Sequence, residues 1–587
     1  MAEKESAPGR YYGYSNPEYN GSKRFSEYIT MRDGTPIAVD YYRPSKDGAV
    51  EEKPLPVVWR LTPYGRAVYE DGKLVPGKTF KEDPAGDRLE TVQWDIMVDV
   101  LTSYGYVVGY ADCRGMKASG GVRWAANSLD EGMDGYEINE WFAAQPFCDG
   151  NTGMFGSSYT GQTQLEVLRT CPPHLKAACV CMTDFNKYDG WVRGGIARAF
   201  GSQPDLDYRL ELESAAPVDG DEDRVLIREA VKQHAYNGKQ VALFQNLRNR
   251  DDWCEDSDSE YWNQVSASTY KDRINSSNAA VYLIGGWFDV FRRDTVIMYN
   301  NLTLPKKMII GPWFHTRPKR EVSLVIEHVR FYDYWLKGID NGIMREDPIY
   351  MKCINGESGK DWSFEMCWPL PGEKPLRFYL SKEESGTIES AADGTLTQEA
   401  YQETEEQSSY EADFTVEDGV ETPCPLDLEK KAMTFTSEAF DKPVHLTGHG
   451  IMSLWMAANT EDIDLFVTVT DVSEDGSIRQ VTDGHLRASK RQTHVPPYNF
   501  LELPWHRGNA LDERKLVSGR PYRLEIDLMP VNYMIKAGHR IRVSLTCAEK
   551  GFYFQTPKPV QAGEAARLTV FHDKIHPSYV ELKTIDR

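Results

Sequence analysis

The stretch from Gly150 to Gln164, GNTGMFGSSYTGQTQ, constrains the fold of this chain more than any other part of it. Residues 152–155 are typical of the end of a buried strand, and residues 162–168 of the helix that follows. The turn between them, Gly156-Ser-Ser-Tyr-Thr-Gly161, has small residues where two backbones must approach each other closely. A serine on such a sharp strand-to-helix turn exposes its hydroxyl above a sheet edge, which is the geometry of a nucleophile elbow.

Ser158, and not Ser157, is the predicted nucleophile, because the first glycine of the turn belongs two residues before it. The usual pattern also has a glycine two residues after the serine, whereas Thr160 stands there and Gly161 comes one residue later. A glycine-serine turn is also common as a purely structural feature. This stretch alone therefore leaves both interpretations open.

The whole chain should hold about three or four domains, because 587 residues are too many for one core. The net charge of −22 argues against a general binder of nucleic acids or anionic membranes.

Ten scattered cysteines without a C-x-x-C pair favour a reduced, cytoplasmic chain that needs no metal and no other cofactor. The N-terminus lacks the apolar core of a secretory signal, and no apolar run approaches the roughly 18 residues of a membrane span. We expect a soluble protein with a small-molecule partner and with no nucleic-acid or membrane partner; whether it is a homodimer is open.

Strands that alternate with helices predict a mostly parallel sheet covered on both faces. The expected elements are a hairpin over 25–44 around Asp33-Gly34, strands 55–61 and 106–110, helices 94–104 and 131–145, strands 279–284 and 307–310, and a helix over 322–336. Residues 1–24 are polar and rich in glycine and tyrosine. We expect them to form a loosely attached arm.

Two further regions differ in pattern from this α/β part. Residues 185–278 are polar and mostly helical, most clearly over 225–246, with nothing that resembles a sheet strand, and predict a helical cap inserted over the sheet. From 371 onward short strands, at 444–446, 450–457, 464–471, 522–528, 539–545 and 566–571, predict an all-β sandwich in which the acidic segment 398–421 is an exposed loop. The predicted domains are 1–184 with 279–370, 185–278, and 371–587.

Three residues of complementary chemistry each follow a predicted strand: Ser158, Asp289 and His315. Open α/β sheets bind ligands beyond the carboxyl ends of their strands, where these side chains would meet. A histidine can take the proton of the serine hydroxyl, and a carboxylate can orient that histidine and stabilise the imidazolium. The order Ser, Asp, His is the one that α/β-hydrolases use. Asp289 alone could also be a cap of the next helix. His315 is preferred among the 12 histidines because only it joins a strand end to a shielding Pro-Trp-Phe segment.

Ester or amide hydrolysis also needs donors for a tetrahedral oxyanion. The backbone N–H of Tyr159 opens the helix after the elbow, where such donors are unpaired. The second donor should come from the loop after an early strand, and Tyr64 in Thr62-Pro-Tyr-Gly65 is placed to offer its phenolic hydroxyl. On spacing alone, Tyr64 is as well explained as a packing aromatic.

Several short motifs together resemble the CocE/NonD family of serine hydrolases, which includes cocaine esterase-like enzymes, α-amino acid ester hydrolases and, further off, X-prolyl dipeptidyl aminopeptidases. The motifs are Gly156-Ser-Ser-Tyr-Thr-Gly161, Gly286-Trp-Phe-Asp289, Gly311-Pro-Trp-Phe-His315, Met31-Arg-Asp-Gly34, Asp112-Cys-Arg-Gly115 with Ser119-Gly-Gly121, and Phe331-Tyr-Asp-Tyr-Trp-Leu-Lys-Gly-Ile-Asp-Asn-Gly342. The resemblance implies an α/β-hydrolase domain with an inserted helical cap and a C-terminal jelly-roll domain. It also implies Ser158, Asp289 and His315 as the triad, with the Tyr64 hydroxyl and the Tyr159 N–H as the oxyanion hole.

The substrate is less constrained than the chemistry. In the amino acid ester hydrolase branch, acidic residues follow the triad aspartate closely, whereas here Val290-Phe-Arg-Arg-Asp294 follows Asp289. Cap carboxylates could replace that cluster or simply form a solvated helix face; they are Asp205, Asp207, Glu211 and Glu213. Aromatic residues crowd the triad loops and favour an apolar or aromatic acyl group; they are Trp287, Phe288, Phe291, Trp313 and Phe314. We expect carboxylic ester hydrolysis through an acyl-enzyme, with an amidase or X-prolyl peptidase as the alternative and an inactive binding protein as a third reading.

Overall fold

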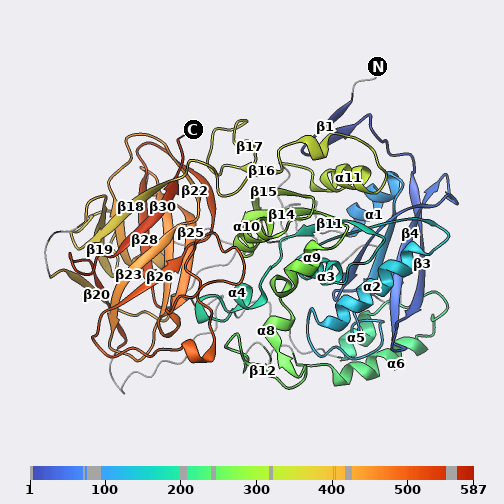
Figure 1. Ribbon diagram of the computed structural model, residues 1–587, viewed down its shortest axis with the longest axis horizontal. Helices are drawn as coiled ribbons and strands as arrows, with labels where there is room; N and C mark the ends of the chain where they lie inside the picture. The colour runs from blue at the N-terminus through green and yellow to red at the C-terminus, as the bar shows by residue number, and fades with distance from the viewer. Residues whose placement is uncertain are drawn as a thin grey trace.

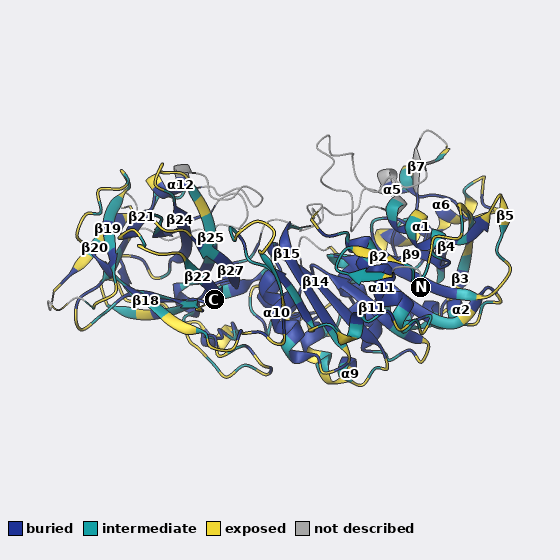
Figure 2. Ribbon diagram, turned by 90° about the horizontal axis from the view of Figure 1, so that it is seen from above, coloured by how far each residue is buried: buried dark blue, intermediate teal, exposed yellow. Residues whose placement is uncertain are grey.

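The computed structural model describes residues 4–70, 73–75, 94–198, 208–239, 243, 246–315, 321–400, 402, 405–416, 426–549 and 565–586. A mixed, mostly parallel sheet with helices is followed by a mostly antiparallel β domain (Figure 1). The central strands of the first sheet are buried, while the exposed residues gather on the outer loops (Figure 2). The predicted fold class is confirmed.

The first sheet has a parallel centre and antiparallel edges. Its parallel strands, in spatial order, are β9 (Val107–Asp112), β6 (Leu55–Thr62), β10 (Cys148–Ser157), β11 (Leu175–Cys181), β14 (Ala280–Phe288), β15 (Lys306–Phe314) and β16 (Ile349–Lys352). The predicted hairpin forms β3 (Gly21–Thr30) and β4 (Pro36–Lys46) beside β9, with β5 (Ala49–Val50) against β4, and β17 (Trp362–Glu365) closes the other edge. Because β10, β14 and β15 run parallel, their carboxyl ends lie at one edge of the sheet.

Both faces of this sheet are covered by helices. On one face Val58 and Val108 pack with α1 (Trp94–Ser103) and α11 (Leu324–Trp335). On the other face Val57 and Trp59 pack with α2 (Leu129–Ala143) and α3 (Tyr159–Leu168), and α10 (Arg292–Asn301) covers β14 and β15. Successive residues of a strand point to opposite faces, so a strand buried on both sides reads as a continuous apolar run. This is why β6 and β9 are visible in the sequence.

Strand β11 is absent from the predicted elements although it lies between β10 and β14. Its sequence, Leu-Lys-Ala-Ala-Cys-Val-Cys, contains small residues of low strand propensity and follows a Pro-Pro pair. The strand forms because both of its neighbours offer unpaired backbone groups, which local sequence does not show.

The N-terminal arm is held more firmly than predicted. Strands β1 (Glu5–Ala7) and β2 (Arg10–Tyr12) form a hairpin on α11. The hydroxyl of Tyr11, which is buried, donates to Asp333 Oδ2 at 2.9 Å, and the Gly9 N–H donates to Glu327 Oε1 at 2.8 Å. The expectation of a loosely attached arm is wrong, because its polar groups find buried carboxylate acceptors that are more than 300 residues away in sequence.

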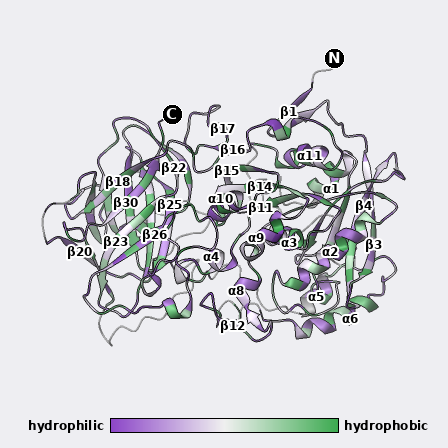
Figure 3. Ribbon diagram, viewed as in Figure 1, coloured by the Kyte–Doolittle hydropathy of each residue, from purple (hydrophilic) through white to green (hydrophobic). Residues whose placement is uncertain are grey.

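The described residues of the inserted region form several short helices. It contains α4 (Lys187–Trp191), α5 (Tyr208–Ser214), α6 (Val225–Gln233), α8 (Tyr261–Gln264) and α9 (Lys271–Asn275). Helix α6 is amphipathic: it buries Ile227, Ala230 and Val231, and apolar and polar residues alternate along its turns (Figure 3). The helix ends before Gly238, whose N–H donates to Arg123 O and where a Cβ would lie 1.9 Å from Trp124 O. The stretch predicted to be most clearly helical, 225–246, is helical over Val225–Gln233, while residues 240–242 and 244–245 lie outside the described residues. The expectation that nothing in this region forms a strand is wrong, because β12 (Trp253–Cys254) pairs with β13 (Ser259–Glu260).

The C-terminal domain consists of mostly antiparallel strands. They are β18 (Lys374–Ser381), β19 (Ala392–Thr397), β20 (Gln407–Glu411), β21 (Met433–Ser437), β22 (Val444–Gly448), β23 (Ile451–Ala458), β24 (Asp464–Val472), β25 (Ile478–Arg487), β26 (Tyr522–Asp527), β27 (Val531–Ile535), β28 (Arg540–Thr546), β29 (Arg567–Phe571) and β30 (Tyr579–Thr584), with the short helix α12 (Leu426–Lys430). The six predicted strands are confirmed. The acidic segment 398–421 is not simply an exposed loop, since β20 pairs with β29 and buries Tyr410; residues 401, 403–404 and 417–421 lie outside the described residues.

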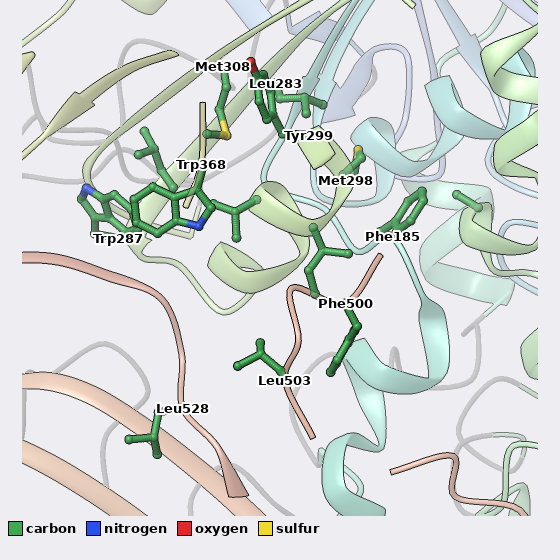
Figure 4. Packing of buried hydrophobic residues seen from close by; sticks show 14 of the residues in the cluster. Phe185, Leu283, Trp287, Met298, Tyr299, Met308, Trp368, Phe500, Leu503 and Leu528 are labelled. Carbon is green, nitrogen blue, oxygen red and sulfur yellow. The ribbon is translucent and has the colours of Figure 1, made fainter. Parts of the chain in front are cut away.

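The two parts of the molecule share one apolar core. The core beneath α10 continues into the β domain. Between the two parts, Trp287 of β14 packs against Trp368, which precedes the β domain, with ring centroids 5.6 Å apart (Figure 4). Phe500 and Leu503, from a loop of the β domain, reach toward α10 in the same cluster (Figure 4). The β domain is therefore packed against the elements that follow β14.

Candidate active site

The turn between β10 and α3 holds Ser158 in a strained backbone conformation. Its φ of 57° and ψ of −123° lie outside the regions that residues with a side chain normally occupy. Gly156 has a φ of 149°, and a Cβ there would lie 2.4 Å from Thr160 Oγ1. A Cβ on Gly161 would lie 2.6 Å from Cys181 O of β11. Gly161 thus permits the close approach of helix α3 to the neighbouring strand, which explains why the second glycine stands at this position.

The side chains of Ser158, His315 and Asp289 form one hydrogen-bonded chain. His315 Nε2 lies 3.0 Å from Ser158 Oγ, and His315 Nδ1 lies 2.5 Å from Asp289 Oδ2. Asp289 and His315 directly follow β14 and β15, so neighbouring parallel strands bring together residues that are far apart in sequence. Asp289 is fully buried, and its Oδ1 accepts the Phe291 N–H at 2.7 Å. A histidine in this arrangement can accept the serine proton while the carboxylate fixes its orientation.

Both candidate oxyanion donors lie beside Ser158. Tyr64, in the loop after β6, hydrogen-bonds with the Ser158 side chain, and its ring packs edge-on against Tyr159 with centroids 6.3 Å apart. Burial raises the pKa of Tyr64 above its ordinary value, although Ser158, Arg123 and Arg60 oppose that rise. The phenol therefore stays protonated and able to donate at neutral pH. Tyr159 is the first residue of α3, so its N–H has no acceptor within the helix.

A buried polar cluster that the sequence analysis did not find holds the side chain of Tyr159. The Tyr159 hydroxyl donates to Glu131 Oε2 at 2.6 Å and accepts from Arg123 Nη2 at 2.6 Å, while Arg123 Nε donates to Glu131 Oε1 at 2.9 Å. Glu131 belongs to the first turn of α2, whose cap is Ser128. No spacing rule connects these residues to the elbow, because the contact depends on how α2 packs against α3.

The aromatic residues around the triad divide into two groups. Phe291 packs edge-on against His315 with centroids 5.6 Å apart, and Phe288 stacks on Phe314 at 5.0 Å. Trp313, in contrast, is 0 % exposed in the core between the sheet and α11, and Trp287 donates its indole N–H to Lys352 O at 2.8 Å. Trp287 and Trp313 thus pack into the core, whereas Phe291 contacts the imidazole of His315 itself. That the five aromatic residues line a substrate pocket stays a prediction.

Two of the described carboxylates that could bind a substrate ammonium, Glu211 of the cap and Asp294 beyond the triad aspartate, have other partners. Glu211 is buried, and its Oε2 lies 2.6 Å from His234 Nδ1. Asp294 accepts the Phe185 N–H at 2.9 Å, and burial raises its pKa to about 6. Glu213 is exposed, and Asp205 and Asp207 lie outside the described residues.

Two further properties concern the described residues as a whole. They contain no group of three or more His, Cys, Asp or Glu side chains that could hold a metal ion. Among the helices of this part of the chain, none combines the length and apolarity that crossing a membrane requires.

Comparisons with known proteins agree with this fold. Residues 33–317 match the X-Pro dipeptidyl-peptidase (S15) family, and residues 341–581 match the X-Pro dipeptidyl-peptidase C-terminal non-catalytic domain. A "putative serine esterase" from Mycobacterium bovis is 28% identical over 99% of this chain and 98% of its own length. The cocaine esterase of Rhodococcus sp. is 24% identical, covering 88% of this chain and 89% of its own. A CocE/NonD family hydrolase from Staphylococcus aureus has the same fold, with a TM-score of 0.72 at 20% identity over 96% of this chain and 94% of that one.

Proposed function

This chain belongs to the CocE/NonD hydrolases of the X-Pro dipeptidyl-peptidase (S15) family, and from that membership we propose that it hydrolyses carboxylic esters through an acyl-enzyme. The observation that carries the proposal is the hydrogen-bonded chain from Ser158 through His315 to Asp289. Ser158 attacks the ester carbonyl while His315 takes its proton, and His315 then returns that proton to the leaving alcohol. In the second half of the reaction His315 takes a proton from a water molecule, which attacks the acyl-enzyme carbonyl, and then returns that proton to Ser158 as the acid product leaves.

The oxyanion of each tetrahedral intermediate forms beside Ser158. The Tyr64 hydroxyl and the Tyr159 N–H are the two donors that we assign to it. Each such donor contributes about 3–4 kcal/mol to lowering the barrier in enzymes of this kind. Burial keeps Tyr64 protonated, so it can donate throughout the neutral range.

An ester is favoured over a peptide for two reasons. A peptidase that recognises a free amino terminus needs a carboxylate for the substrate ammonium, and here Glu211 and Asp294 already have other partners. A peptidase must also protonate a poor amine leaving group, whereas an alcohol leaves more readily. Phe288, Phe291 and Phe314 near the triad favour an apolar or aromatic acyl group. The S15 family match keeps an amidase or X-prolyl peptidase as the second candidate.

Labelling with a fluorophosphonate probe tests the proposed nucleophile. We expect the wild-type protein to be labelled covalently and the Ser158→Ala variant not to be. Ser157→Ala is the matched control, because Ser157 is the adjacent serine but belongs to β10, and it should retain labelling. An unlabelled wild type would contradict the enzyme assignment and favour a binding protein.

Turnover of two substrate series tests the preference for esters. We expect p-nitrophenyl esters with apolar or aromatic acyl groups to be cleaved faster than X-Pro-anilides. Higher kcat/KM on the anilides would reverse the order of the two candidates.

A further inference from the structure

Two consecutive arginines in the first turn of α10 each pair with a carboxylate of the C-terminal β domain. Arg292 pairs with Asp483 of β25, and Arg293 Nη1 lies 2.8 Å from Asp527 Oδ2 at the end of β26. Helix α10 begins three residues after Asp289. The β domain therefore contacts the segment that holds the acid of the proposed triad.

Of these two ion pairs, the one between Arg292 and Asp483 also contacts Asp289. Arg292 Nη1 donates to the backbone carbonyl of Asp289 at 3.2 Å, while Nη2 of the same guanidinium bonds to Asp483 Oδ1. Arg293 instead donates to the Asp189 carbonyl and pairs with Asp527. One planar guanidinium thus joins the backbone of Asp289 to a carboxylate from the other domain.

The position of Asp483 is itself fixed within the β domain. Gln480 Nε2 donates to Asp483 Oδ1 at 3.1 Å, and the Asp483 carbonyl accepts the Met529 N–H at 2.9 Å. Arg292 is 8% exposed, so its charge has little access to water and depends on this partner. The rigid strand β25 therefore determines where the guanidinium lies.

Other contacts within the turn hold Asp289 from the side of the sheet. Its N–H donates to Gly286 O at 3.0 Å, and its Oδ1 accepts the Phe291 N–H at 2.7 Å. The backbone carbonyl of Asp289 accepts two hydrogen bonds from Arg292, one from its backbone N–H at 3.3 Å and one from its guanidinium. Of these contacts, the guanidinium alone connects the turn to the β domain. Without it the turn is held by its own backbone contacts, and the carboxylate can move relative to His315.

We propose that Asp483 is a positioning residue for the triad: through Arg292 it fixes the turn that carries Asp289. The inference rests on the proposed function, because it takes Asp289 as the partner of His315. The β domain then has a role in the reaction besides its contribution to the shared core. Misplacing a catalytic group by about 1 Å can lower a rate by about a hundredfold, so a small movement of this turn is sufficient.

Steady-state kinetics on a p-nitrophenyl ester test the proposal. We expect Asp483→Asn, which keeps the shape but removes the charge, to lower kcat about tenfold while KM stays within about twofold. Asp483→Glu should recover part of the loss. Arg292→Lys should reproduce it, because a lysine lacks the second arm that reaches the Asp289 carbonyl. Asp483→Asn combined with Arg292→Lys should be no slower than the slower single variant, since both act on the same contact.

Asn301→Ala is the matched control. Asn301 ends the same helix and exchanges hydrogen bonds with the backbone of Asn499 in the β domain, but it lies far along α10 from Asp289. This variant should lose some thermal stability and keep the wild-type kcat. Rates are taken per labelled serine, so that unfolded protein does not count.

Three results would overturn the inference. The first is a wild-type kcat in Asp483→Asn, and the second is an equal loss of kcat in Asn301→Ala. The third is independent, multiplying losses in the double variant, which would mean that Asp483 does not act through Arg292. A wild type that the fluorophosphonate does not label is a different outcome, because it overturns the proposed function and this inference with it.

Discussion

Ser158 has a backbone conformation that costs free energy for any residue with a side chain. A φ of 57° with a ψ of −123° is of order 1–3 kcal/mol less favourable than an allowed conformation. The surrounding contacts compensate for this cost: the Ser158 N–H donates to Cys181 O, and Thr160 bonds to both the N–H and the carbonyl of Ser157. The strain places the hydroxyl above the sheet edge, within reach of His315.

At the same scale, Tyr64→Phe tests the assigned oxyanion donor. Removing one donor should lower kcat about a hundredfold and leave KM nearly unchanged, because the hydrogen bond strengthens only as charge develops on the oxygen. The ring remains, so packing against Tyr159 is kept. Steady-state kinetics of ester hydrolysis by Tyr64→Phe and by the wild type measure both constants.

Tyr41→Phe is the control for that variant. The Tyr41 hydroxyl bonds to the exposed Glu27, away from the triad, and its loss should leave kcat unchanged. If Tyr64→Phe retains the wild-type rate, Tyr64 is a packing aromatic and the second donor lies elsewhere.

Among the elements, the elbow depends on the absence of a side chain at Gly156. We expect Gly156→Ala to destabilise the fold by more than about 3 kcal/mol and to abolish labelling, because its Cβ would lie 2.4 Å from Thr160 Oγ1 and 2.7 Å from Thr160 O. Thermal unfolding and fluorophosphonate labelling measure the two effects.

Gly150→Ala separates crowding from backbone strain. Gly150 precedes the buried part of β10, has a φ of 87°, and would have no atom within 4 Å of an added Cβ. It should cost only about 1 kcal/mol and keep labelling. Equal costs at Gly150 and Gly156 would show that backbone conformation, and not the contact with Thr160, makes glycine necessary.

Over the whole molecule, Asp527 joins three regions through charge. Its carboxylate pairs with Arg193 of the cap at 2.9 Å and with Arg293 of α10 at 2.8 Å, and all three side chains are buried. Burial alone would raise the pKa of Asp527, but the two arginines outweigh it and hold that pKa well below the usual range. A buried pair that loses one member leaves an uncompensated charge, which is costly.

Asp527→Asn should therefore lower the free energy of unfolding by about 3–5 kcal/mol at pH 7. Since the folded-state pKa is depressed, the contribution of Asp527 is complete above the ordinary aspartate pKa of about 3.9 and is lost as the pH falls below it. The stability difference between wild type and variant should thus narrow in acid. Thermal unfolding at several pH values measures it.

Asp586→Asn is the control, because Asp586 pairs with Lys374 at an exposed site and should change stability little. A difference between wild type and Asp527→Asn that stays constant into acid would contradict this account.

The buried parallel strands and the residues at their ends could be predicted because they depend on short-range patterns. A strand covered on both faces is apolar along its length, so the apolar runs of β6, β9, β14 and β15 could be predicted as strands. A tight turn needs glycine, and this located the elbow. Ser158, Asp289 and His315 each stand directly after such a strand, so the topology of a parallel sheet was sufficient to bring them to one edge.

Tertiary structure decided the features that depend on which surfaces meet. Strand β11 forms between two neighbours although its small residues have weak strand propensity, and the polar N-terminal arm is held by carboxylates of α11. The contacts of Glu131 with Tyr159 and of Asp483 with Arg292 join residues that no spacing rule connects. The sequence by itself was sufficient to predict the proposed triad, because local backbone geometry and strand order bring these three residues to one edge of the sheet. Only the packing of helices and domains decided which side chains position those residues, because these contacts use buried charged groups. A buried charge is stable only where the whole fold supplies its partner.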